Sequence, residues 1–114
     1  MLGLAARKCA PCTKGTPPIP PEEAKALLDE LKGWSLIEGK ALRQELVLKD
    51  FMAAVRLINA IAKVAETEDH HPDLHLTGYR KLAIELSTHA IGGLSDNDFI
   101  LAAKIDALPR ELQD

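Results

Sequence analysis

The chain has 114 residues, 46% of them hydrophobic and 27% charged, which is the composition of one ordinary globular domain. Its formal charge of −3 argues against a surface that binds nucleic acid by neutralising phosphates. No apolar run approaches the roughly 18 residues that a membrane span needs. The N-terminus lacks the pattern of a signal peptide. We therefore expect a cytoplasmic protein with no nucleic-acid or membrane partner.

Residues 1–20 are predicted to form an extended, proline-rich arm ahead of a single domain over residues 21–114. The arm carries Cys9 and Cys12 in the sequence CAPC. A redox CxxC is expected between a strand and a helix, but TKGTPPIPP follows here, and a zinc site would need two more ligands. We predict a mobile arm without a catalytic role, and metal binding or redox chemistry are the alternatives.

The first part of the domain predicts a helix followed by a hairpin. The helix spans residues 21–33, with Pro21 suited to its first position and Gly33 to its end. Two strands then flank the turn at Gly39. In the second strand, ALRQELVL, leucines share a face that only Gln44 interrupts. This pattern is typical of a hairpin with one buried face.

The second part repeats this order. Asp50 caps a helix over residues 51–68, and two strands flank Gly78. Ser95 and Asp98 form a variant of the capping box that opens the last helix. On the long helix, the predicted core-facing stripe consists of Phe51, Val55, Ile58, Ile61, Ala62 and Ala65. The order α-β-β-α-β-β-α predicts an α+β fold, a four-stranded antiparallel sheet with helices packed on one face.

The stretch AETEDHHPDLHL, residues 65–76, holds three of the four histidines beside several carboxylates. Neighbouring side chains in extended structure point to opposite faces, so His70 and His71 are poorly placed to share a metal ion. The helical metal motif HExxH is absent as well. His75 is expected to be a strand residue that faces solvent or a partner. We therefore predict no metal site.

Acid–base chemistry is the better explanation of the cluster. Because the strands around Gly78 run side by side, the start of the first lies near the end of the second. His70 or His71 should therefore meet His89, in LSTH, near the start of the last helix. Imidazoles that converge in this way titrate in the range that proton transfer near neutral pH requires.

These residues resemble the signature of the pterin-4a-carbinolamine dehydratases. That signature has an acidic residue, three positions, His-His-Pro, an aromatic residue, a histidine ten residues after it, and an aspartate in the last helix. The likeness begins near Gly33-Trp34 and covers about two thirds of the chain, and some bacterial members carry a similar KCAPC arm. The matching residues are Glu66, His70, His71, Pro72, Tyr79, His89 and Asp98.

The resemblance implies the loss of water from a 4a-hydroxytetrahydropterin to give a quinonoid dihydropterin. It implies that His70 is the principal acid–base residue, that His89 is a second one across the pocket, and that His71 assists or orients. Which histidine is acid and which is base stays open. No metal, nicotinamide or other cofactor is implied. The implied substrate contacts are Glu66, Asp69, Pro72, Leu74, Ser87, Thr88 and Asp98.

Two features of the resemblance bear on substrate and partners. Leu74 stands where animal members carry tryptophan, so an aromatic wall is absent there. The family implies a dimer or tetramer and a place beside the aromatic amino-acid hydroxylases, whose pterin cofactor it recycles. The alternatives are a molybdopterin-related pterin role, or a dimerisation or regulatory module, since animal members also bind a homeodomain transcription activator.

Overall fold

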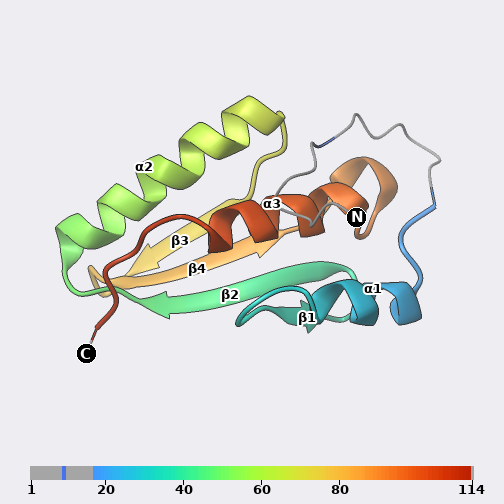
Figure 1. The fold of residues 1–114 in the computed structure, drawn as a ribbon, viewed down its shortest axis with the longest axis horizontal. Helices are drawn as coiled ribbons and strands as arrows, with labels where there is room; N and C mark the ends of the chain where they lie inside the picture. The colour runs from blue at the N-terminus through green and yellow to red at the C-terminus, as the bar shows by residue number, and fades with distance from the viewer. Residues whose placement is uncertain (1–8, 10–16, 114) are drawn as a thin grey trace.

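A computed structural model describes Cys9 and residues 17–113, with the side chain of His89 excepted. The predicted order of elements is confirmed (Figure 1). The helices are α1 (Pro21–Leu28), α2 (Phe51–Glu68) and α3 (Asp96–Asp106), with a short 3-10 helix, η2 (His89–Ile91), before α3. The strands are β1 (Ser35–Ile37), β2 (Ala41–Val47), β3 (Asp73–Thr77) and β4 (Lys81–Leu86). The fold is therefore α+β, as the sequence predicts.

The four strands form one antiparallel sheet in the order β1-β2-β4-β3. Leu86 at the end of β4 pairs with Leu42 of β2, and Ile84 pairs with Leu74 of β3. Alternate residues of β4 are buried, because side chains along a strand point to opposite faces. The register brings the end of β4 beside the start of both neighbouring strands. The histidines were predicted to meet at this end of the sheet.

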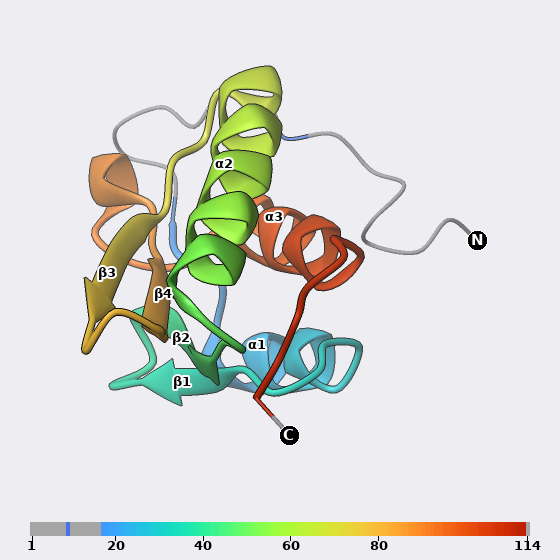
Figure 2. The ribbon, with the colours of Figure 1, turned by 90° about the vertical axis from the view of Figure 1, so that its left-hand side faces the viewer.

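Helices α2 and α3 cover the same face of the sheet, and the other face is open to solvent (Figure 2). The predicted boundaries of α2 are confirmed, and the Asp50 carboxylate accepts the Ala53 N–H at 2.8 Å. The predicted stripe is wrong at Phe51, which is 51% exposed, and at Ala62, which is exposed as well. The residues that α2 buries are Ala53, Ala54, Leu57, Ile61 and Ala65.

The physical reason for this error lies in the small residues at the start of α2. Ala53 and Ala54 let the first turns approach the sheet closely, so the buried stripe begins there and continues through Leu57. Phe51 sits on the first turn, on the side away from that contact. A hydrophobic pattern alone gives Phe51 more weight than two alanines, which explains why the predicted stripe is rotated.

Helix α1 is shorter than predicted, because it ends at Leu28 instead of Gly33. Two further turns follow, in which the N–H groups of Glu30 and Leu31 each bond to the carbonyl three residues back. Gly33 has φ +77°, and a β-carbon there would lie 3.1 Å from the Gln44 amide nitrogen. This amide donates to the Lys32 carbonyl at 2.7 Å, which explains how Gln44 interrupts an apolar face without loss of packing.

Helix α3 is buried on most sides, because α2 and the sheet enclose it. Its N-terminus carries the predicted capping box of Ser95 and Asp98. The preceding loop is fixed by the N-terminal arm, whose Ile19 N–H donates to the Leu94 carbonyl at 2.9 Å. In the part of the chain that the structure describes, no helix combines the length and apolarity needed to cross a membrane.

Candidate active site

The end of α2 sets the directions of His70 and His71. Pro72 disfavours helix at the residue before it, and the helix stops at Glu68. Asp69 then adopts the left-handed conformation (φ 52°, ψ 41°), which aspartate tolerates better than most residues. The His70 N–H still reaches back to the Ala65 carbonyl at 3.2 Å. The backbone of His70 is thereby tied to the helix end.

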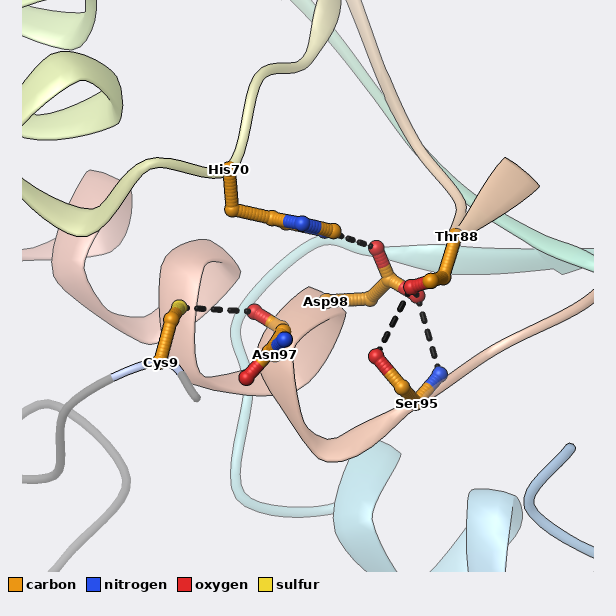
Figure 3. Close-up of polar contacts among 6 residues, drawn as sticks. All are labelled: Cys9, His70, Thr88, Ser95, Asn97 and Asp98. Atoms are coloured by element: carbon orange, nitrogen blue, oxygen red, sulfur yellow. Dashed lines mark hydrogen bonds and ion pairs between the residues drawn. The ribbon is translucent and has the colours of Figure 1, made fainter. Parts of the chain in front are cut away.

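The His70 side chain turns inward to the start of α3. Its Nε2 lies 2.6 Å from Oδ1 of Asp98 (Figure 3). The imidazole is 13% exposed and the Asp98 side chain is 0% exposed. A carboxylate so buried needs hydrogen-bond donors, since an unpaired charge away from water is strongly destabilising. His70 supplies one of these partners, and the ring remains partly open to solvent.

The other oxygen of Asp98 is held by two residues of the loop between β4 and α3. The Thr88 hydroxyl donates to Oδ2 at 2.8 Å, and the Ser95 N–H donates to it at 3.0 Å. The two hydroxyls of Thr88 and Ser95 are themselves 2.7 Å apart (Figure 3). We call His70, Thr88, Ser95 and Asp98 the Asp98 network. It joins the end of α2, the end of β4 and the start of α3.

The other two histidines of the cluster lie at the surface. His71 Nε2 is 2.8 Å from Oε2 of Glu66, and both side chains are exposed. The prediction that His70 and His71 do not converge is thus confirmed. His75 faces the open side of the sheet, where its Nε2 is 3.5 Å from the Glu85 carboxylate.

The place of His89 is described only for its backbone, which opens η2 directly after Thr88. Its side chain lies outside the described part of the structure, so its meeting with His70 stays a prediction. The approach of the two segments is nevertheless clear, because Thr88 and His70 bond to the same carboxylate.

The remaining predicted contacts surround the network. Glu66 and Asp69 are exposed at the end of α2. Pro72, just before β3, and Leu74, within β3, are half-buried. Leu74 packs against the core cluster. Ser87 and Thr88 line a recess of about 520 Å³, a volume that includes the solvent at its mouth. Its other walls are Lys40, Ala41, Gly92 and Gly93.

Tyr79, the aromatic residue of the motif, lies in the turn between β3 and β4, at the far end of the hairpin from His70. Its side chain is exposed, and the Arg80 guanidinium stacks over the ring 5.4 Å from its centroid.

Within the described residues, no three His, Cys, Asp or Glu side chains gather closely enough to hold a metal ion.

Sequence reasoning missed two contacts near the site. Ser95 was expected only as a helix cap, and the capping pattern was the available signal. The second is the contact of Cys9 with the ends of α2 and α3. Its N–H donates to Glu68 at 2.8 Å, and its sulfur is 3.6 Å from the Asn97 carbonyl oxygen. Burial and the negative charge of Glu68 raise the pKa of the Cys9 thiol to about 12. Cys12 lies outside the described residues.

The sequence of this chain is similar to those of known proteins. The family model described as pterin 4 alpha carbinolamine dehydratase matches residues 17–108. A relative of that family name from Nitrosospira multiformis is 47% identical over 105 residues, which cover 92% of this chain and 91% of the relative. In Arabidopsis thaliana, the protein named pterin-4-alpha-carbinolamine dehydratase 2, mitochondrial, is 42% identical and aligns with 97% of this chain and 62% of its own length.

A solved structure is also similar. The crystal structure titled transcriptional coactivator/pterin dehydratase from Brucella melitensis superposes with a TM-score of 0.74 at 30% sequence identity. The match covers 79% of this chain and 96% of that one. The family model and these relatives show that the chain belongs to the pterin-4a-carbinolamine dehydratase family.

Proposed function

We propose that this chain is a hydro-lyase that dehydrates 4a-hydroxytetrahydropterin to quinonoid dihydropterin. In this reaction the N5–H bond breaks and its electron pair forms the C4a=N5 double bond. The C4a–O bond breaks at the same time, and the departing hydroxyl takes up a proton to leave as water. One base at N5 and one acid at the hydroxyl are sufficient, and no oxidant, reductant or metal is consumed.

The observation that carries the proposal is the 2.6 Å contact between His70 and the buried Asp98. A carboxylate at this distance stabilises the imidazolium that forms when His70 accepts a proton. The ring is partly exposed, so a substrate can reach it. We assign to His70 the removal of the N5 proton.

His71 and His89 are the proposed proton donors for the departing hydroxyl. His71 is exposed, and its Nε2 lies 2.8 Å from the Glu66 carboxylate. His89 follows Thr88 at the edge of the recess that Ser87 helps to line. We propose that the pterin lies between these segments, in contact with Pro72, Leu74 and Ser87, while Glu66 and Asp69 lie at the rim.

We propose that the chain recycles the pterin cofactor of aromatic amino-acid hydroxylases, with residues 21–114 as the catalytic domain and residues 1–20 as an accessory arm. We also propose a homo-oligomer, because β3 is an edge strand whose half-buried Leu74 and Leu76 leave apolar surface beside an unpaired edge.

The proposal is tested by following the decay of 4a-hydroxytetrahydropterin in ultraviolet absorbance, with and without the protein. We expect His70→Ala to lower kcat by about 10²-fold or more. His75→Ala is the matched control, because it removes an exposed histidine of β3 that is not part of the Asp98 network, and it should keep the wild-type rate. Equal rates for wild type and His70→Ala would overturn the assignment. An inactive wild-type protein that forms a stable complex with a regulatory partner would favour the module alternative.

A further inference from the structure

The hydroxyl groups of Thr88 and Ser95, beneath Asp98, make a contact with each other that a helix cap does not require. Thr88 and Ser95 are both buried, and their oxygens are 2.7 Å apart. Only the Thr88 hydroxyl reaches the carboxylate of Asp98. Ser95 contacts that carboxylate through its backbone N–H, and its hydroxyl accepts the Asp98 backbone N–H in the capping box. The Ser95 hydroxyl is therefore one bond further from His70 than any other polar group of the Asp98 network (Figure 3).

Counting protons fixes the direction of every hydrogen bond in the network. A hydroxyl has one proton to donate, and an ionised carboxylate has none. Because Thr88 donates its proton to Oδ2 of Asp98, its oxygen must accept the proton of the Ser95 hydroxyl. Oδ2 then receives two hydrogen bonds, one from the Thr88 hydroxyl and one from the Ser95 N–H. The chain of bonds runs one way, from Ser95 through Thr88 to Asp98.

The same direction extends to the imidazole. An ionised Asp98 can only accept at Oδ1, so the His70 nitrogen beside it must carry a hydrogen. That nitrogen is Nε2, and it faces a carboxylate with no exposed surface. In neutral His70 the other nitrogen, Nδ1, is then the free acceptor.

We propose that Thr88 and Ser95 are positioning residues: their hydroxyls orient Asp98 so that His70 holds its proton on Nε2 and presents Nδ1 as the base for the substrate. The effect on rate rests on the proposed dehydratase function, whereas the state of the ring does not. In the reaction, Nδ1 takes the N5 proton, and the resulting imidazolium later releases it to solvent. Thr88 acts through His70 and need not touch the pterin.

The state of the ring is measured by nuclear magnetic resonance on the full-length chain labelled with ¹⁵N-histidine. His70→Gln identifies the His70 signals by their loss. In the wild-type protein, at a pH high enough for the ring to be neutral, we expect the proton on Nε2 and not on Nδ1. A wild-type ring that carries its proton on Nδ1 would overturn the proposal, whether or not the protein is active.

Substitution of Thr88 tests its role. Thr88→Val keeps the shape and removes the hydroxyl, so we expect a mixture of both ring forms and a kcat about tenfold lower with KM unchanged. Thr88→Ser restores the donor and should restore both readouts. Thr67→Val is the matched control, because that exposed hydroxyl donates to the Lys63 carbonyl of its own helix and is not part of the Asp98 network. A Thr88→Val protein with raised KM and normal kcat would instead place Thr88 against the substrate.

Ser95→Ala removes the far end of the chain and keeps the backbone N–H that holds Asp98. We expect a decrease in kcat of about threefold, smaller than for Thr88→Val, because Thr88 can still donate to Asp98. A larger effect for Ser95 than for Thr88 would contradict the order of the chain. If the wild-type protein lacked dehydratase activity, the proposed function would fail, and the ring measurement would still decide the inference.

Discussion

The neighbouring residues His70 and His71 each pair with a carboxylate, and the two pairs differ chiefly in burial. His70 and Asp98 are 2.6 Å apart, with 13% and 0% of their side chains exposed. His71 and Glu66 are 2.8 Å apart, with 56% and 77% exposed. The distances are nearly equal, so distance alone does not distinguish the pairs.

The difference in burial gives the two pairs different energies. An exposed pair contributes about 0.2–1 kcal/mol, since water and salt screen it. Removal of one partner from a buried pair costs about 3–5 kcal/mol, because the other charge stays without compensation. Loss of one partner should therefore cost the His70–Asp98 pair more than the His71–Glu66 pair.

Asp98→Asn should give the largest effect. The amide keeps the size of the side chain but removes the charge and places hydrogens where the Thr88 hydroxyl and the Ser95 N–H donate. We expect kcat to fall by about 10²-fold or more. The free energy of unfolding in urea should fall by about 3 kcal/mol.

Asp96→Asn is the control for this change, because Asp96 is an exposed carboxylate in the same first turn of α3. It should retain the wild-type kcat and nearly the wild-type stability. If the two variants behaved alike, burial would not distinguish the two histidine–carboxylate pairs.

The contact of Cys9 involves a third carboxylate, Glu68. The Glu68 side chain is 8% exposed, which lies between the values for Asp98 and Glu66. With its pKa raised to about 12, the Cys9 thiol forms its reactive thiolate only at a higher pH than an ordinary cysteine does. In a Cys12→Ser background at about pH 8, we expect iodoacetamide to react at least about tenfold more slowly with the folded chain than with the chain in concentrated urea.

Glu68→Gln should accelerate this reaction in the folded chain, because it removes the negative charge that helps to keep the thiol protonated. A moderate increase in the alkylation rate indicates the loss of this charge. A variant that only released Cys9 from its contacts would instead react equally fast in the folded and the unfolded chain. Identical alkylation rates with and without urea in the starting protein would show that Cys9 does not pack against α2 and α3.

Glu66→Gln should give the smallest effect. We expect the free energy of unfolding to change by less than about 0.5 kcal/mol, and the change should vanish at high salt. The value of kcat should stay within about threefold of the wild type, because His71 keeps its access to water. A loss of activity as large as that of Asp98→Asn would mean that the orientation of His71 matters as much as that of His70.

The sequence was sufficient for the features that depend on local pattern. The boundaries of α2 were predicted because Asp50 caps it and Pro72 follows it, and the alternation in β4 predicted its buried face. The capping box of Ser95 and Asp98 was also predicted from its spacing. Each of these signals lies within a few residues of the structure that it specifies.

Features that depend on how elements pack were predicted less well. The buried stripe of α2 was rotated, because two alanines decide the contact and a phenylalanine does not. The bond between Asp98 and His70 joins residues 28 positions apart, so no local pattern specifies it. The sequence placed both residues in one region, but it could not show that Asp98 is fully buried beneath His70.

The Asp98 network has a consequence for folding. Its three segments meet only after the hairpin of β3 and β4 has closed and α3 has docked on the sheet. Contacts between residues distant in the chain form late, because loop closure must be paid for first. A partly folded chain or a fragment that lacks α3 therefore has the histidines without the Asp98 network. Recovery of activity during refolding should report the final docking step and not the earlier formation of the helices.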